Sequence, residues 1–415
     1  MKWFRIVAVI TLTLMVGVGF GQTTVSPYSS SGLGELAYPG MPHNIAMGEV
    51  GIATPSYWSI NTVNPALLAN NQLTTFQVGF QGDYRNFSTS NTSQSNGTGG
   101  LRFLSLALPV KPRRWASSVG LTPYSTVNYN FFETVPVPDT DFTSRQAFEG
   151  EGGLTRLDWA NGIRLSGKFL VGFKASYVFG SIRKSSRSIV AGDDSPFSIR
   201  YNVQESYRDF IFQMGAFYKI ALTDTKGFNV GATYSPSITL NGTRDENFTR
   251  VSAGTPIATN EINEDLPAQF DLPHEIGLGV AYEDLNHLTI GLDVTLTQGG
   301  EYAADPENFR ETLRISAGME FIPDYSSVRS YFQRISYRAG VSFVQLPYIA
   351  QGQDINDFGV SFGSAFPISG LSTIDTAFKF GWRGSTQEGL IRENYVQFVF
   401  GITINDRWFI KRRYD

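Results

Sequence analysis

Histidine and cysteine side chains carry much of the nucleophilic and metal chemistry of proteins, and this sequence has few of them. The 415-residue chain contains three histidines and no cysteine. The strand pattern described below places His274 and His287 at opposite ends of two consecutive strands, and His43 in a separate N-terminal segment. No Ser-His-acid set can therefore form at one point, and no Cys-His spacing suits zinc. Because Gly277 and Gly279 fall inside a predicted strand, a phosphate-binding glycine loop is excluded too, and we expect no enzymatic activity, metal or cofactor.

Charged side chains are the other candidates, and they fall on one face of regularly alternating strands. In residues 169–187, apolar side chains such as Phe173 and Tyr177 occupy one face, while Lys174 lies on the other. This period of two is typical of β-strands. We interpret the polar face as the lining of a lumen, where carboxylates and cations could bind a solute or pair with one another. The expected lumen-lining charges are Arg156, Asp158, Arg164, Lys174, Asp293, Arg338, Asp375 and Lys379.

The same alternation predicts fourteen strands between residues 73 and 404. Short connections such as 166–168 alternate with longer polar connections such as 85–99, 131–151 and 241–273. Short turns on one side and long loops on the other are typical of an outer-membrane barrel, whose short turns lie in the periplasm. We therefore expect an all-β fold, a 14-stranded antiparallel transmembrane β-barrel.

Composition separates this fold from its main alternative, a large secreted all-β domain. Aromatic residues make up 14% of the chain and charged residues 17%, the latter below the roughly 25% usual in soluble domains. After the N-terminus, no stretch reaches the roughly 18 consecutive apolar residues of a transmembrane helix. On the lipid face of a barrel, an Arg or Lys at mid-bilayer costs about 2–4 kcal/mol, which explains why the charges avoid the apolar face. The aromatic content, the absence of cysteine and the loop asymmetry together favour the membrane barrel.

Residues 1–21 have the pattern of a secretory signal peptide. Lys2 and Arg5 precede an apolar stretch that is too short to span a bilayer. Gly19 and Gly21 form a small-x-small cleavage site, after which Gln22 would begin the mature chain. Export of this kind predicts a place in the cell outer membrane of a Gram-negative bacterium, in contact with outer-membrane lipid and lipopolysaccharide. The formal net charge of −4 argues against a nucleic-acid partner.

Residues 22–72 are irregular and precede the first strand. A Met-Gly-x-x-Gly-x-Ala run is followed there by Asn-Pro-Ala, which resembles the N-terminal hatch of the FadL-type outer-membrane transporters of hydrophobic compounds. The stretches Ser26–Leu36, Gly120–Tyr129 and Asn405–Asp415 look like a Bacteroidota branch of that family with PorV-type relatives. The residues of the pattern are Met47, Gly48, Gly51, Ala53, Asn64, Pro65 and Ala66.

The resemblance implies a barrel (73–404) whose lumen is plugged by the hatch (22–72), and a periplasmic C-terminal tail (405–415). It implies that both termini are periplasmic and that the protein takes up hydrophobic compounds such as long-chain fatty acids. Pro123 lies inside a predicted strand, where proline removes a ladder hydrogen bond, so it would mark the kink that opens a lateral exit. The implied hatch and gate residues are Gly48, Gly51, Asn64, Pro65 and Ala66.

Two alternatives stay open. Residues 22–72 could be only a periplasmic extension. Charged residues outnumber apolar ones on the expected lumen face, and PorV-type relatives act inside larger machines. The protein could therefore be a non-transporting accessory subunit of a secretion or outer-membrane assembly complex. Its partner would then be another outer-membrane protein, which the acidic loop 241–273 could dock, whereas a transporter would bind a hydrophobic small molecule.

Overall fold

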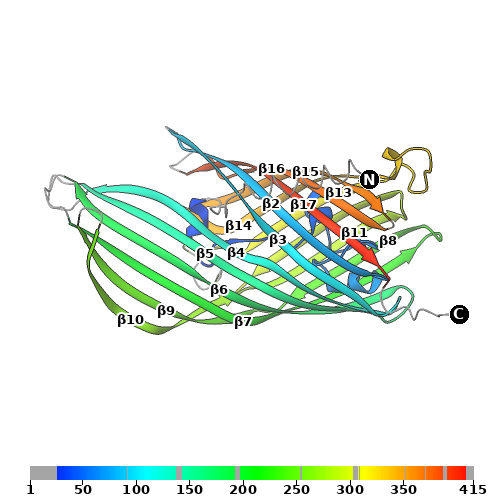
Figure 1. Cartoon of the computed structure of the whole chain (residues 1–415), viewed down its shortest axis with the longest axis horizontal. Coiled ribbons are helices and arrows are strands. Elements are labelled where there is room, and N and C mark those ends of the chain that lie inside the picture. Colours follow the sequence, from blue (N-terminus) through cyan, green and yellow to red (C-terminus); the bar gives the residue numbers. More distant parts are fainter. Residues whose placement is uncertain are drawn as a thin grey trace, which may run out of the picture.

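The described residues form a closed antiparallel β-barrel that surrounds the N-terminal part of the chain (Figure 1). The predicted signal peptide and residues 408–415 of the predicted tail lie outside the described part. Within that part, no helix is both long and apolar enough to cross a membrane. The computed structural model describes residues 26–90, 92–136, 143–191, 197–252, 255–301, 307, 309–350, 352–369, 371–386 and 390–407.

Strand segments in antiparallel register build the wall. The barrel closes where β17 pairs with β2, from Arg392 opposite Ser88 to Asp406 opposite Thr74. The segments are β2 (Thr74–Ser88), β3 (Ser93–Lys111), β4 (Trp115–Pro136), β5 (Thr143–Arg164), β6 (Phe169–Ala191), β7 (Phe197–Ala221), β8 (Lys226–Ser235), β9 (Ile238–Ser252), β10 (Thr255–Leu272), β11 (His274–Asp284), β12 (Leu288–Gln298), β13 (Thr312–Phe321), β14 (Ser336–Ala350), β15 (Gln353–Ser369), β16 (Ser372–Arg383) and β17 (Arg392–Asp406).

Two of the barrel strands are interrupted. β7 pairs with β8 along one half and with β9 along the other, so β8 and β9 are two parts of one strand. β10 and β11 are likewise parts of the next strand, and they pair with β9 and β8. The interruptions fall at Pro236 and Pro273, because proline cannot donate a ladder hydrogen bond. Counted this way, the described wall has fourteen barrel strands, and the predicted fold class is confirmed.

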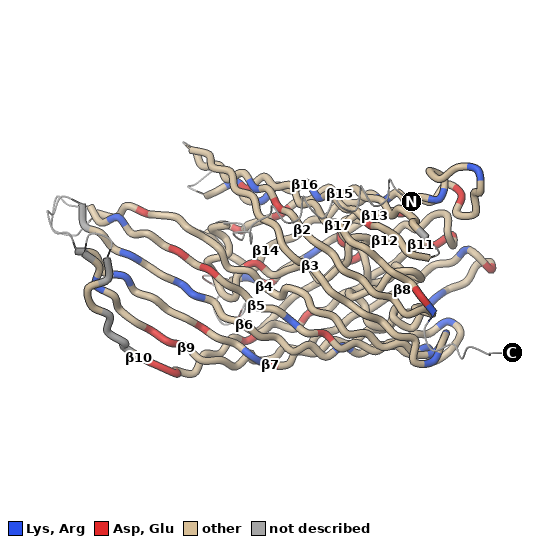
Figure 2. The backbone as a smooth tube through the Cα atoms, viewed as in Figure 1, with Lys and Arg blue, Asp and Glu red and all other residues tan. Residues whose placement is uncertain are grey.

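The outward face of the wall carries a band of large apolar side chains. Aromatic rings pack against one another on it, with centroids 5.0 Å apart for Tyr177 and Phe210 and 4.7 Å apart for Phe378 and Phe398. These side chains remain exposed, because no other described part of the chain covers them. Figure 2 shows many of the charged residues toward the two ends of the barrel. An exposed apolar band of this extent requires a hydrocarbon environment.

The predicted loop 241–273 is wrong. These residues form most of the β9–β10 hairpin, paired from Ile238 opposite Leu272 to Ser252 opposite Thr255. The predicted loops 85–99 and 131–151 are also largely strand, in the β2–β3 and β4–β5 hairpins. Beyond the apolar band both faces of a hairpin meet water, so hydrophobic alternation is lost while backbone pairing continues.

The hairpins formed by β4–β7, β9 and β10 extend the wall well beyond the other strands (left side of Figure 1). A row of glycines crosses this extended wall. Gly153 and Gly180 have φ of +147° and +150°, and a Cβ at either, or at Gly242, would lie under 3.0 Å from the backbone of the adjacent strand. Only glycine allows so close an approach, and the wall bends along this row, which we name the glycine crease.

The N-terminal segment, defined here as residues 26–73, runs along the inside of the barrel from one end to the other. It contains η1 (Pro27–Ser30), β1 (Glu35–Leu36), α2 (Pro42–Ala46) and η2 (Pro65–Asn70), drawn in blue in Figure 1. Ser26 Oγ donates to Glu393 at the long-hairpin end of the wall, whereas Asn70 accepts from Arg164 at the short-turn end. Ser26, the first described residue, thus lies at the long-hairpin end. The predicted periplasmic position of the two termini falls on residues outside the described part and stays a prediction.

Candidate functional site

Backbone atoms of the N-terminal segment bond directly to side chains on the inner wall. The Asp293 carboxylate on β12 accepts from the backbone N–H groups of Gly51 at 2.7 Å and Ile52 at 2.8 Å. On the far side of the barrel, Lys174 on β6 donates to the carbonyl of Thr62 at 3.1 Å. Irregular backbone needs such partners when it is buried, and the polar inner wall supplies them.

A buried ion-pair cluster adds a second attachment. Glu49 is 6% exposed, and its carboxylate accepts from Lys379 on β16 at 2.7 Å and from Arg314 on β13. Two cations from separate strands thus meet one anion of the N-terminal segment. Buried charges are tolerated only when paired in this way.

Glycines on the inner wall allow the backbone of the N-terminal segment to contact the backbone of the barrel strands. A Cβ at Gly172 or Gly215 would lie under 3.0 Å from Ala66 N or Asn64 Oδ1, and one at Gly318 under 3.0 Å from Met47 O. Further wall glycines meet the same segment, namely Gly162, Gly231, Gly291, Gly340 and Gly363. Across these strands there is no space for even one methyl group between the N-terminal segment and the wall.

The predicted hatch residues all lie at this contact. Asn64 accepts from Ala66 N at 3.0 Å, which caps η2, and donates to the carbonyls of Ile52 and Ala216. Pro65 is the first residue of η2, where a missing N–H is harmless. Gly48 has a φ of +68°, and a Cβ there would lie under 3.0 Å from β14 backbone.

Most of the other predicted lumen charges pair with one another rather than with the N-terminal segment. Arg156 lies 3.4 Å from Asp158, and Arg338 lies 2.9 Å from Asp375. Arg164 sits near the short-turn end and donates to Asn70 at 2.7 Å. The sequence leaves open whether Arg156 and Arg164 would bind a ligand or pair within the protein; in the structure both bond to groups of the protein itself.

A second charged cluster lies nearer the long-hairpin end and was not predicted. Glu35 on β1 bonds Arg85 and Arg383, each at 2.9 Å, and Arg383 also bonds Asp357 at 2.7 Å. Arg383 lies on the same strand face as Lys379, so the alternation could have predicted that it lines the interior. Arg85 follows the predicted strand end at residue 84 and would have required a longer strand.

Arg102 is an interior cation outside the ion pairs, as Lys174 is. It donates to the carbonyl of Tyr38 at 2.6 Å and to Gln81, and no carboxylate lies within 4.0 Å of it in the described part of the chain. A register shift opposite Gly79 and Phe80 turns Arg102 inward, although strict alternation from Leu104 places it on the apolar face. Such a bulge is invisible to a period-two pattern.

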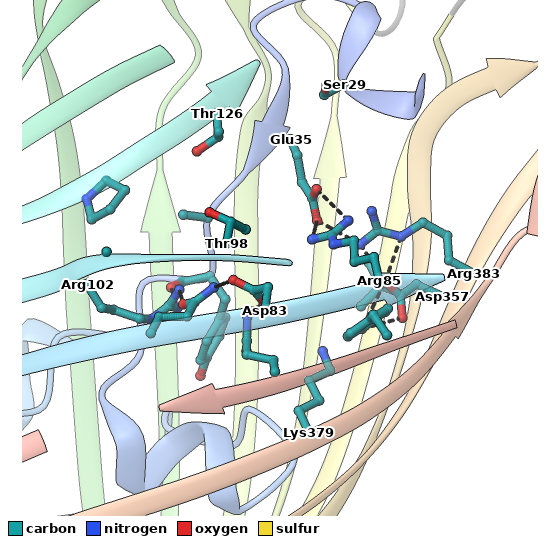
Figure 3. A pocket seen from close by; sticks show the side chains of 18 of the residues that line it. Ser29, Glu35, Asp83, Arg85, Thr98, Arg102, Thr126, Asp357, Lys379 and Arg383 are labelled. Carbon is teal, nitrogen blue, oxygen red and sulfur yellow. Dashed lines mark hydrogen bonds and ion pairs between the residues drawn. The ribbon is translucent and has the colours of Figure 1, made fainter. Parts of the chain in front are cut away.

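These residues surround a cavity of about 310 Å³ between the N-terminal segment and the long-hairpin end (Figure 3). Arg102 lies on one side of it and the Glu35–Arg85–Arg383 cluster on the other. An adjoining cavity of about 240 Å³ shares Glu35, Tyr38 and Glu49. The interior is therefore charged, and most of its charges are balanced by ion pairs. Among the described residues, Arg102 and Lys174 are buried cations outside these pairs.

The first cavity reaches the wall where two strands separate. β3 pairs with β4 only from Lys111 to Leu104, and further along β4 pairs with β1 instead. Thr98 and Leu101 on the β3 side and Thr126 on the β4 side line the cavity. We name this break in the wall the β3–β4 seam.

Pro123 lies on β4 two residues beyond the last β3–β4 pair, Leu104 with Leu121. The β4–β5 register also shifts between Pro123 and Ser125, which is the signature of a bulge. The proline predicted as a strand kink therefore sits at the seam and lines the cavity. Its part in any exit remains a prediction.

Solved structures with the same fold cover nearly the whole chain. A FadL homologue of Pseudomonas aeruginosa is 14% identical, with a TM-score of 0.60 over 89% of this chain and 98% of that one. The toluene transporter TodX of P. putida is 16% identical, with a TM-score of 0.58 over 89% and 100%. The toluene transporter TbuX of Ralstonia pickettii is 15% identical, with a TM-score of 0.56 over 89% and 99%.

Comparison of sequences is more specific than comparison of folds in this case. None of the curated proteins compared with the chain matches it. The model of the BamG family matches residues 2–415. With practically the whole sequence matched, the chain belongs to the BamG family.

Proposed function

We propose that this protein is an outer-membrane barrel for uptake of hydrophobic compounds, with its long hairpins outside the cell and its short turns in the periplasm. The observation that carries the proposal is the cavity that opens through the β3–β4 seam. The apolar band supports a membrane position, and three structures of similar fold are described as a FadL homologue and toluene transporters.

The chemistry at the seam favours an amphipathic compound such as a long-chain fatty acid. Arg102 is a buried cation without a carboxylate partner in the described part of the chain, so a ligand carboxylate would supply its missing charge. Leu101 on β3 is 48% exposed and Leu36 on β1 is 42% exposed. Both border the seam and would contact the hydrocarbon tail, which could then leave sideways past Pro123.

In this proposal the N-terminal segment is the gate. Its inner end would have to shift to open a path to the periplasm, and Asn64 and Pro65 fix its contact with β7. Asn64→Ala and Pro65→Ala should therefore lower uptake of a labelled fatty acid without lowering the amount of folded barrel.

Replacement of Arg102 tests the ligand site. Arg102→Gln should weaken fatty-acid binding by the purified barrel at least about tenfold, because a hydrogen bond to a charged group contributes about 1.5–3 kcal/mol. Arg114→Gln, an exposed change in the β3–β4 turn at the other end of the barrel, is the matched control. Equal binding by both variants, or no binding by the unchanged protein, would refute the site.

The second candidate is a non-transporting subunit of a larger outer-membrane complex. It is favoured by the charged interior and by the attachment of the N-terminal segment through Asp293, Glu49 and the wall glycines. A subunit of this kind would co-purify stoichiometrically with another outer-membrane protein in mild detergent. Its fatty-acid uptake would equal background, and the Asn64 and Pro65 variants would leave that background unchanged.

A further inference from the structure

The outward face of the extended wall is hollowed where it bends. A groove of about 780 Å³ lies across β4, β5, β6 and β7, beside the glycine crease at Gly152, Gly153 and Gly180. Its lining is amide, hydroxyl and charged, with Asn128, Glu149, Arg183, Asn202 and Gln204 among its residues. This is a solvent-facing surface, separate from the interior cavities.

The groove starts directly beyond the apolar band. Along β6 the outward side chains pass from Tyr177 and Phe179 to Ser181 and Arg183, and β7 passes from Phe210 to Arg208 at the same level. In the proposed orientation, this level is where the outer leaflet changes from hydrocarbon to headgroups. A ligand in the groove could therefore keep its acyl chains on the band below.

Arg200 lines the groove, and Arg187 on the adjacent strand lies directly beside it. Arg187 on β6 lies directly opposite Arg200 on β7 in the strand register, and like charges in this position destabilise a sheet. Arg187 donates to Ser198 at 2.9 Å, and the Nε of Arg200 is enclosed without a hydrogen-bond partner. Neither has a carboxylate within 4.0 Å among the described residues.

The two acidic residues of the groove, Glu149 and Glu151, form no ion pair with Arg187 or Arg200 among the described residues. Glu151 lies 2.9 Å from Arg183, which also donates to Gln204 at 3.1 Å. Glu151 is thus balanced by its own partner. The arginine pair instead suits a phosphate, because guanidinium groups bind phosphate oxygens through two parallel hydrogen bonds.

We propose that this groove binds the phosphorylated saccharide head of lipopolysaccharide in the outer leaflet. Arg187 and Arg200 would hold a phosphate, while Asn128, Asn202 and Gln204 would bond sugar hydroxyls. The inference rests on the proposed membrane orientation and is independent of whether the barrel transports anything. It assigns the extended wall a lipid-binding role that the interior site does not include.

Binding of rough lipopolysaccharide to the purified full-length protein tests the proposal. The double variant Arg187→Gln/Arg200→Gln should bind at least about tenfold more weakly, since two charge-assisted contacts are lost. Arg114→Gln together with Arg113→Gln, in the turn at the far end, removes the same charge and should bind like the unchanged protein. A chelator of divalent cations should not abolish binding, because arginines and not a metal hold the phosphate.

Further ligands separate the head group from general attraction to lipid. The same glycolipid without its phosphates, and phosphatidylglycerol, should both bind weakly. The proposal is overturned if the unchanged protein binds phosphatidylglycerol as tightly as lipopolysaccharide, or if the double variant binds normally. If the double variant does not fold, lipopolysaccharide binding is measured with the single variant Arg200→Gln, whose folding is checked by thermal unfolding. Normal binding by that variant would likewise overturn the proposal.

Discussion

Glu49 and Lys379 are 330 residues apart in the sequence, and their side chains meet at 2.7 Å inside the barrel. Arg314 completes the cluster from a second strand of the wall. Because all three groups are held in one geometry, the N-terminal segment and the wall should unfold together. The cluster is therefore a place where stability and closure of the lumen can be measured at once.

Glu49→Gln should lower the free energy of unfolding by about 3–5 kcal/mol, because it leaves two interior cations without their anion. Urea unfolding of the detergent-solubilised protein measures this. Glu151→Gln is the control, since Glu151 and Arg183 are 67% and 57% exposed and exposed pairs contribute only about 0–1 kcal/mol. Equal losses in the two variants would show that the interior cluster contributes no more than a surface pair.

Gly318→Ala should displace the N-terminal segment, because the new methyl group would occupy the position of the Met47 carbonyl. We expect a cost of about 1–3 kcal/mol and a rise in ion conductance in planar bilayers, with the barrel still folded. Gly100→Ala has open space around its Cβ and should behave like the unchanged protein. If both variants conduct alike, the glycine contact does not close the lumen.

Phe398→Arg should impair assembly, since Phe398 faces outward beside Phe378 and an Arg at mid-bilayer costs about 2–4 kcal/mol. Gln397→Arg should be tolerated, because Gln397 faces inward and contacts Asp83 at 3.1 Å. Heat-modifiable migration in gels reports the folded fraction. The reverse order of tolerance would mean that the two faces are assigned backwards.

Labelling of single cysteines tests the orientation, and the absence of native cysteine makes it specific. Ser90→Cys, between β2 and β3 at the long-hairpin end, should react with a membrane-impermeant maleimide on intact cells. Gly167→Cys, in the short exposed turn between β5 and β6, should react only after the outer membrane is opened. Reaction of Gly167→Cys on intact cells would invert the proposed orientation.

The strand number could be predicted from sequence because the apolar band imposes alternation on every strand that crosses it. The β9–β10 hairpin could not, since Asn241, Thr243 and Asp245 on one face of β9 and Arg244 on the other are all polar or charged and leave no periodic signal. The inward turn of Arg102 depends on a bulge, and the seam depends on where two backbones separate. Neither feature has a signature in residue type.

The interior site was predictable in part for a similar reason. Asp293 and Lys379 lie on the strand face opposite the apolar band, and alternation alone was enough to predict that they line the interior. Their partners Gly51 and Glu49 lie in irregular chain, where no period applies. The contacts between the irregular N-terminal segment and the wall depend on how the barrel closes around the segment. Local sequence patterns do not encode this arrangement.

The hydrogen bond from Ser26 to Glu393 spans 367 residues and has a consequence for the order of folding. β17 provides part of the surface on which the N-terminal segment docks. Glu393 accepts from Ser26, and Asn405 donates to the Trp58 carbonyl at 2.8 Å. The N-terminal segment, which precedes every barrel strand in the sequence, therefore cannot finish docking until β17 is in place. Contacts so distant in sequence form slowly, so a nascent barrel passes through a stage in which its walls are complete and its lumen is still open to water.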